Sequence, residues 1–425
     1  MMNINWSGFS KKTYPERLKT LRDSDLLSHE LQENLEKNET LSVAIADQLS
    51  ENVVGTFSLP FSIVPEVIVN NQAYTVPYVT EEPSVVAAAS FACKIINRSG
   101  GFSALVQQRL MIGQVALYQV PDREQACQEI LNQKDQLLEI ANQAYPSIVK
   151  RGGGARELRV EKVSGQTDFL VVYLHVDTQE AMGANMLNTM LEALKPHLES
   201  LSCGQSLMGI LSNYATESLV TSSCRIAFHY LSPNKDEARE LANKIVLASH
   251  FAQADPYRAA THNKGIFNGI DALLIATGND WRAIEAGAHA YASRDGLYRG
   301  LSLWTLDSEK EELIGEMTLP MPIATKGGSI GLNPRVVLSH ELLGQPSAKD
   351  LAQIIVSMGL AQNFAALKAL VGAGIQQGHM KLQAKSLALL AGAKEAEVPK
   401  LVEGLIAEKT FNLEKAKSIL KALRS

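Results

Sequence analysis

Residues 257–292 read YRAATHNKGIFNGIDALLIATGNDWRAIEAGAHAYA. Within this stretch, residues 269–277 form a short apolar run that is typical of a β-strand. The run ends at the turn signal Gly278-Asn279-Asp280, where a helix is predicted to begin with Asn279 or Asp280 as its N-cap and to close near Gly296. The stretch therefore predicts a strand, a tight turn and a helix in succession, just after a helix predicted at residues 236–251.

Two β-rich segments lie far upstream. Residues 57–69 and 73–79 are separated by Asn70-Asn71, a pattern that predicts a hairpin. Glu82-Pro83-Ser84 then opens an apolar helix, with proline at its start. Before the hairpin, residues 15–48 are polar with helical periodicity, so the chain is predicted to begin with helices.

The pattern changes between residues 110 and 215, where strands and helices alternate at shorter spacing. This change predicts a smaller α+β domain inserted into a larger one. Its predicted elements are strands at residues 110–120, 158–163 and 169–176, and helices at residues 122–149 and 185–201. Beyond the insert, the sequence predicts strands at residues 224–231 and 301–319, and several short helices from residue 347 onward.

The composition is that of an ordinary globular protein. The chain has 425 residues, of which 46% are hydrophobic and 20% charged, enough for two or three domains. A net charge of −5 gives no basic footprint for nucleic acid. The four cysteines lack metal-ligand spacing, and neither a secretory signal nor a run long enough to cross a bilayer is apparent. We therefore expect a soluble, cytoplasmic protein without a metal site.

The common nucleotide and protease motifs are missing. No GxGxxG follows a predicted strand, and neither GxxxxGK[ST] nor HExxH occurs. GGSIG at residues 327–331 fits GxSxG, but Lys326 precedes it and Asn333-Pro334 follows it, so we expect a glycine-rich turn with no helix after it. Generic motifs thus indicate only an enzyme of mixed helix and strand.

Four separated segments carry a more specific signal. They are ENVVGTF with TEEPSVVAAAS, EAMGANMLNTMLE, the stretch at 257–292, and GLAQNFAALKALVGAGIQQGHM. In order and spacing, from Glu51 to Met380, the chain resembles the class II (bacterial-type) 3-hydroxy-3-methylglutaryl-coenzyme A (HMG-CoA) reductases. The resemblance implies an α+β fold with a large HMG-CoA-binding domain around a central helix (residues 1–109 and 216–374). It also implies a small non-Rossmann dinucleotide-binding domain (residues 110–215) and a helical C-terminal flap (residues 375–425).

The implied reaction is the four-electron reduction of HMG-CoA to mevalonate and free coenzyme A by two NAD(P)H. By resemblance, Lys264 stabilises the oxyanion of each hydride step and Glu82 handles the proton on the carbonyl oxygen. Asp280 tunes both groups, and His379 protonates the coenzyme A thiolate. Glu81 is a rival to Glu82. Each residue also has a purely structural interpretation: Lys264 as a surface lysine, Glu81 and Glu82 as acids at a helix start, Asp280 as a helix N-cap and His379 as a solvated histidine.

Further positions carry over as binding residues. Ser84, Arg258 and Asn268 match those that hold the substrate, and an arginine can grip its carboxylate with two parallel hydrogen bonds. The matches to the family's dinucleotide contacts are Met182, Gly183, Asn185 and Asn213. Surface or capping polarity and an ordinary strand-to-helix turn are the alternative interpretations of these residues. His262, near Lys264, is interpreted as a scaffold residue.

One departure from the family bears on the cofactor. Members that prefer NADH carry an acidic residue before the glycine turn, whereas this chain has Asn142-Gln143-Ala144-Tyr145, followed by Lys150 and Arg151. We expect NADPH, with NADH possible as well. The expected partners are HMG-CoA, coenzyme A and a second copy of the chain, in a homodimer with its active site at the interface. The alternatives are a non-catalytic acyl-CoA- or nucleotide-binding protein and a reductase of another acyl-CoA on the same fold.

Overall fold

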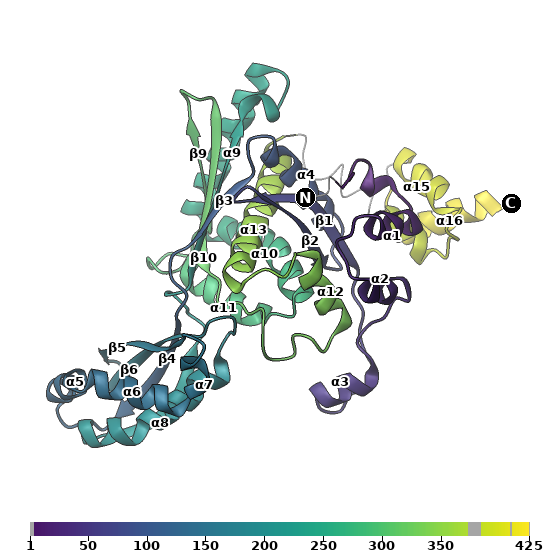
Figure 1. Ribbon diagram of the computed structural model, residues 1–425. Helices are drawn as coiled ribbons and strands as arrows, with labels where there is room; N and C mark the ends of the chain where they lie inside the picture. Colours follow the sequence, from purple (N-terminus) through teal and green to yellow (C-terminus); the bar gives the residue numbers. More distant parts are fainter. Residues whose placement is uncertain (1–3, 373–383, 409, 425) are drawn as a thin grey trace.

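The computed structural model describes residues 4–372, 384–408 and 410–424. It contains two separate β-sheets, each covered by its own helices, which confirms the predicted α+β class (Figure 1). After a short 3-10 helix at Phe9–Lys11, three short α-helices follow, as the polar periodicity predicts: α1 (Tyr14–Arg22), α2 (His29–Glu36) and α3 (Val43–Leu49). An extended segment at residues 51–60 then leads into the first sheet.

The larger sheet has six strands in the order β2-β1-β3-β8-β10-β9. Their bounds are β1 (Phe61–Val69), β2 (Gln72–Val79), β3 (Phe102–Val106), β8 (Leu219–Ala227), β9 (Ser302–Asp307) and β10 (Glu312–Pro320). β1 and β2 form the predicted hairpin, and Asn70 and Asn71 both adopt the positive φ that suits its two-residue turn. Only the β1–β3 pairing is parallel.

Two long helices, α10 (Pro256–Ala276) and α13 (Ala348–Val371), form the centre of this larger part and pack against each other. Gly269 of α10 sits at their contact: a Cβ there would lie 3.0 Å from the carbonyl oxygen of Met358 in α13. A side chain at this position would have to push its neighbours away by a few tenths of an ångström, so glycine favours this close approach. The surrounding helices are α4 (Val85–Asn97), α9 (Lys235–Ala254), α11 (Trp281–Ala292) and α12 (Pro334–Leu342).

The strand predicted at residues 269–277 is wrong, because these residues form the second half of α10. The helix begins at Asp255, whose side chain accepts a hydrogen bond from the backbone N–H of Arg258, with Pro256 in the first turn. Residues on every side of this half are buried, since β2, α9 and α13 surround it. A helix buried all round shows no polar face, so its apolar run cannot be told from a buried strand by periodicity.

The smaller sheet has four antiparallel strands in the order β5-β6-β4-β7. Helices α5, α6 and α8 pack on one face of it, at the lower left of Figure 1. The bounds are β4 (Met111–Tyr118), α5 (Arg123–Asn132), α6 (Lys134–Ala144), α7 (Pro146–Val149), β5 (Gly154–Val163), β6 (Phe169–Asp177), α8 (Ala184–Ser202) and β7 (Gln205–Ser212). These strands and helices all fall within the predicted insert.

Several predicted elements differ in detail. The single helix at residues 122–149 is three helices, interrupted at Gln133 and before Pro146. Strand β7 was not predicted, and β8 begins five residues before the predicted start at Cys224. The expectation of no helix after residues 327–331 is wrong, because Asn333 caps α12 and Pro334 occupies its first turn. No strand leads directly into the GGSIG turn, however, so it is not a nucleophile elbow.

The two sheets are joined where β3 and β8 lie side by side. These strands are antiparallel partners, with Val106 opposite Val220. The backbone N–H of Leu110 donates to Glu217 O at 2.9 Å, and the Ser218 hydroxyl donates to Leu110 O at 2.8 Å. The outgoing and returning linkers therefore remain hydrogen-bonded to each other as they leave the larger sheet.

After α13, the described chain resumes at residue 384 and ends in α15 (Val398–Ala407) and α16 (Leu413–Arg424). These last helices share a small core of their own, built from Leu401, Leu405 and Leu420 among others. Within the described residues one helix, α13, is long and apolar enough to cross a membrane by length and composition, but 72% of its apolar window is buried inside the protein. It is a core helix of 24 residues, longer than the short helices predicted there.

Candidate active site

Lys264 and Glu82 form an ion pair between two segments that are far apart in the sequence. The Lys264 Nζ lies 2.5 Å from Glu82 Oε2. Asn268, one turn later on the same face of α10, donates its Nδ2 hydrogen to Glu82 Oε1 at 3.3 Å. The side chains of Lys264 and Glu82 are 61% and 37% exposed, so the pair stays accessible to a ligand. Three of the predicted site residues are thus brought together.

The segment before α4 presents Glu82 rather than Glu81. Glu81 is exposed and forms no ion pair with any described residue, whereas Glu82 faces α10. Ser84 beside it adopts φ 75°, a left-handed conformation that is costly for a residue other than glycine. Its side chain does not cap α4. A strained residue with a free hydroxyl next to an ion pair is characteristic of functional sites.

Arg258 lies in the first turn of α10. Its guanidinium is half-buried and has no carboxylate partner among the described residues. Burial lowers the pKa of Arg258 below its usual range, although an arginine keeps its charge. A half-buried cation without a counter-ion is well suited to bind a carboxylate from a ligand.

His262 is a scaffold residue, as interpreted from the sequence. Its Nε2 lies 2.7 Å from Ser302 Oγ and 3.1 Å from Asn363 Nδ2, inside the core. Burial, helped by the charge of Arg258, lowers the pKa of His262 to about 3, so the ring is neutral at physiological pH. This network fixes α10 against β9 and α13.

Asp280 is the N-cap of α11, one of the two residues predicted for that position. Its Oδ1 accepts hydrogen bonds from the backbone N–H groups of Arg282 (3.1 Å) and Ala283 (3.2 Å), and it pairs with the Arg282 side chain. It contacts neither Lys264 nor Glu82 among the described residues. From Lys264 to the end of α10 the helix axis runs about 18 Å, so Asp280 lies at the far end of the helix.

Asp280 instead lines a cavity of about 670 Å³ between the part of the protein built on the smaller sheet and the part built on the larger sheet. Met182, Gly183 and Asn185 line the same cavity at the start of α8. Gly183 adopts φ 92°, and a Cβ on it would lie 2.3 Å from the Thr178 methyl carbon, so only glycine fits this turn. The three predicted dinucleotide contacts therefore share one wall, with the N-terminus of α8 open beside them.

Asn213 does not line this cavity. Its backbone carbonyl packs against Gly287 of α11, where a Cβ would lie 2.4 Å from the Asn213 oxygen. His379 lies outside the described residues. Among the described residues no group of three side chains gathers that could hold a metal ion.

Tyr145 and Arg151, which the sequence analysis already relates to the choice of cofactor, line the cavity on the side of the smaller sheet. Lys326 and the turn at residues 327–330, which the sequence analysis did not assign to the cofactor, line it on the side of the larger one. The side chains of Arg151 and Lys326 form no ion pair with described residues. The only available signal for Lys326 was a glycine-rich turn next to a lysine.

A second and larger cavity, of about 1090 Å³, lies between the N-terminal segment and the outer side of α4. Its walls combine aromatic side chains, among them Trp6 and Phe91, with the cations Arg17, Lys94 and Arg98. Such a lining suits a ligand with both apolar and anionic parts.

Comparisons with known proteins agree with this geometry. A family profile described as hydroxymethylglutaryl-coenzyme A reductase matches residues 13–384. A 3-hydroxy-3-methylglutaryl-coenzyme A reductase of Archaeoglobus fulgidus is 41% identical over all of this chain and 96% of that protein. A probable reductase of Borreliella burgdorferi is 33% identical over 88% of this chain and 86% of that protein.

Two solved structures from Streptococcus pneumoniae are more similar still. The first, a 3-hydroxy-3-methylglutaryl-coenzyme A reductase, is 76% identical with a TM-score of 0.87, covering 99% of this chain and 100% of that chain. The second, a class II enzyme described as bound to NADPH in open conformations, is 77% identical with a TM-score of 0.86, covering 87% of this chain and all of that chain.

Proposed function

The chain belongs to the class II hydroxymethylglutaryl-coenzyme A reductase family, and we propose that it reduces HMG-CoA to mevalonate and free coenzyme A with two equivalents of NADPH. The observation that carries this function is the contact of Lys264 with Glu82, supported on one side by Asn268. The half-buried Arg258 adds a carboxylate-binding group at the start of the same helix.

These residues can supply the acid–base chemistry of the reaction. The Lys264 ammonium stabilises the negative charge that develops on the carbonyl oxygen of the substrate. Glu82, in contact with that ammonium, holds or donates the proton that the oxygen needs. By resemblance, His379 protonates the sulfur of coenzyme A as it leaves. NADPH, when bound, supplies the hydrides.

The 670 Å³ cavity fits a phosphorylated dinucleotide. The first turn of α8 offers backbone N–H groups behind the left-handed Gly183, a suitable place for a pyrophosphate. Arg151 and Lys326 add unpaired cations to the lining. The cavity lining also contains the Glu180 carboxylate, which accepts hydrogen bonds from Thr325 and from the backbone N–H of Ala348. It therefore repels a phosphate less than a carboxylate without such donors would. NADPH is therefore the proposed cofactor.

We assign the coenzyme A part of the substrate to the 1090 Å³ cavity beside α4. Aromatic side chains suit the apolar portions of that group, and Arg17, Lys94 and Arg98 suit its phosphates. Replacing Lys94 with Ala should raise KM for HMG-CoA several-fold and leave KM for mevaldehyde, which lacks coenzyme A, unchanged. An equal rise for both substrates would refute this assignment.

We propose a homodimer whose active site lies at the interface. In one chain, Lys264 and Glu82 meet near the middle of α10, whereas Asp280 lies beyond its C-terminal end, so a second copy is needed to bring the partner subunit's Asp280 and cofactor cavity to the lysine. In the extended segment at residues 51–60, Val54 and Phe57 are 102% and 90% exposed, which is unusual for apolar side chains that no partner covers. Light scattering that finds an active monomer would contradict this assembly.

We further propose residues 110–215 as the small NAD(P)-binding domain, residues 1–109 and 216–374 as the large domain, and residues 375–425 as the flap. The separate four-stranded sheet and the separate core of the last helices support these divisions. The cytoplasm is the proposed location, because the one long apolar helix among the described residues is a core helix.

A direct assay tests the reaction. Purified protein should oxidise about two NADPH per HMG-CoA consumed, since a thioester becomes an alcohol in two hydride steps. A ratio near one, with free mevaldehyde accumulating, would refute the two-step reduction. Binding of HMG-CoA without turnover would favour the non-catalytic alternative, and turnover of acyl-CoAs that lack the carboxylate held by Arg258 would favour another substrate.

A further inference from the structure

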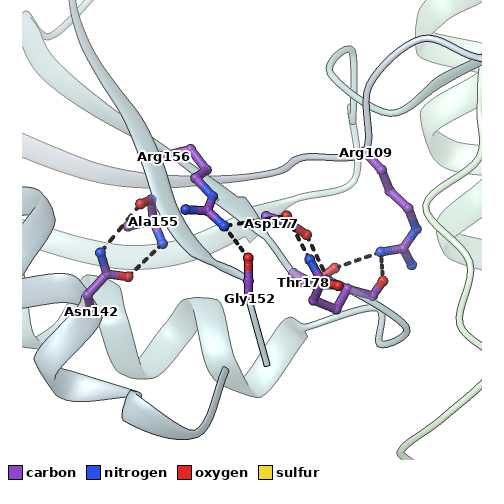
Figure 2. A network of polar contacts seen from close by, with 8 residues as sticks. Arg109, Asn142, Gly152, Ala155, Arg156, Asp177 and Thr178 are labelled. Carbon is purple, nitrogen blue, oxygen red and sulfur yellow. Dashed lines mark hydrogen bonds and ion pairs between the residues drawn. The ribbon is translucent and has the colours of Figure 1, made fainter. Parts of the chain in front are cut away.

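Arg109 lies in the linker that leads from β3 of the larger sheet into β4 of the smaller one. Its guanidinium is largely buried, and three of the groups it binds belong to one turn; Figure 2 shows its bond to Thr178. Its Nη1 donates to Thr178 Oγ1 at 3.3 Å and to the carbonyl oxygen of Gln179, and its Nη2 donates to the carbonyl oxygen of Ala181 at 3.1 Å. The fourth acceptor is the carbonyl oxygen of Ile323, on the opposite wall of the cofactor cavity.

The turn held by Arg109 leads directly into the cavity wall. Residues 178–181 immediately precede Met182 and Gly183, and the Thr178 hydroxyl closes the turn by donating to Ala181 O at 2.7 Å. Because Gly183 packs directly on the Thr178 methyl group, a shift of Thr178 would move Gly183 as well. The position of this turn therefore sets the shape of the wall at the start of α8.

Glu180 ties the same turn to the larger part of the molecule. Its backbone oxygen accepts from the N–H groups of Thr325 (3.0 Å) and Lys326 (3.2 Å). Its Oε2 accepts from the Thr325 hydroxyl at 2.5 Å and from the N–H of Ala348, the first residue of α13, at 2.7 Å. With Arg109, these contacts hold the turn from two sides.

Within the smaller part, the contacts continue from the turn toward Arg151, which also lines the cavity. Gln179 donates through its backbone N–H and its side chain to Asp177, at 3.0 and 2.8 Å. Asp177 pairs with Arg156, which in turn donates to the carbonyl oxygen of Gly152, next to Arg151 (Figure 2). Arg109 and Glu180 are thus the two residues that connect this network to the larger part.

We propose that Arg109 is a positioning residue for the nucleotide: by holding the turn at residues 178–181 against Ile323, it keeps the start of α8 in the shape that binds NADPH. The proposal rests on the cofactor assignment made above. Removing the guanidinium would leave three carbonyl oxygens and a hydroxyl without their shared donor, so the turn would relax. A lysine cannot replace this fork, because its single nitrogen cannot reach acceptors spread across the same span.

The experiment compares Arg109→Met and Arg109→Lys with the wild type, in the full-length chain. Arg123→Met is the control, because Arg123 pairs only with Asp168 and Ser164, away from the cavity. Nucleotide fluorescence gives the Kd for NADPH, and calorimetric titration gives the Kd for HMG-CoA. The Kd and KM for NADPH should rise about tenfold or more in Arg109→Met and less in Arg109→Lys, since the loss of a hydrogen bond to a charged group corresponds to about a tenfold change in affinity.

The Kd for HMG-CoA, kcat at saturating NADPH and all constants of the control should stay close to the wild-type values. An unchanged Kd for NADPH in Arg109→Met, or an equal loss of HMG-CoA binding, would overturn the proposal. If Arg109→Met does not fold, the test uses Thr178→Val, which removes one acceptor and keeps the arginine. This variant must still raise the Kd for NADPH without raising the Kd for HMG-CoA. Wild-type protein that binds NADPH but does not reduce HMG-CoA would refute the proposed function and leave the role of Arg109 testable by binding.

Discussion

Mixing two inactive variants tests whether each active site is built from two chains. Lys264→Ala removes the ammonium that lies 2.5 Å from Glu82, and Asp280→Asn removes the carboxylate at the far end of α10. The lysine variant alone should lose about 10²- to 10³-fold in kcat, the usual scale for losing an oxyanion stabiliser. Asp280→Asn should also be strongly impaired, although asparagine preserves the cap of α11.

Coexpression of the two variants with different affinity tags should restore activity. In a mixed dimer, one site lacks both groups and the other keeps both. Purified mixed dimers should therefore recover about half of the wild-type kcat, and a randomly paired population about a quarter, by the symmetry of a two-fold dimer. The assay is NADPH oxidation with HMG-CoA at saturation.

The control pair is Lys264→Ala with Glu82→Gln. These two groups contact each other within one chain, so every site in a mixed dimer lacks one of them and no activity should return. Absence of recovery with the first pair, in dimers that carry both tags, would refute a site shared between chains. Recovery with the control pair would show that Lys264 and Glu82 of different chains work together.

Three further outcomes are expected. His379→Gln should lower HMG-CoA reduction by about 10²- to 10⁴-fold and spare mevaldehyde reduction, which releases no thiol; equal losses in the two assays would contradict its role as the acid. Tyr145→Asp should move the kcat/KM ratio from NADPH toward NADH, because a carboxylate in the cavity lining repels a 2′-phosphate; a wild type that already prefers NADH would contradict this. Burial and, to a smaller extent, the charge of Glu285 raise the pKa of Asp271 to about 8 in the folded protein. The unfolded chain loses the same proton near pH 4, so the free energy of unfolding should fall as pH rises from about 4 to about 8. Asp271→Asn should flatten that decline in Tm, and an unchanged slope would show that Asp271 does not cause it.

Local signals predicted much of the fold. The Asn70-Asn71 hairpin, the start of α11 at Asp280 and the insert around residues 110–215 each follow from turn residues, caps or a change in spacing. The second half of α10 could not be predicted in this way, because burial on all sides removed the polar face by which a helix is recognised. Tertiary contacts decided that element.

The site depended on the resemblance to a greater extent. Nothing local shows that Glu82 will meet Lys264, 182 positions away, or that Glu82 rather than Glu81 faces α10. Both are results of how α4 packs against the central helices. The contacts of Arg109 could not be predicted from the sequence, because most of its acceptors are backbone carbonyl oxygens, which every residue possesses. The proposed roles of Asp280 and His379 stay predictions.

The junction between the two sheets has an evolutionary and an engineering consequence. The chain leaves the larger sheet after β3 and returns to it at β8, and these strands are hydrogen-bonded neighbours. The smaller part is therefore inserted at the position where a hairpin between β3 and β8 would have its turn. A short turn in place of residues 110–216 would leave the order of the larger sheet's strands unchanged. The smaller part, which we propose binds the nucleotide, is thus a module that can be acquired, exchanged or re-tuned at one point of the chain, and the contacts of Arg109 and Glu180 connect it to the larger part.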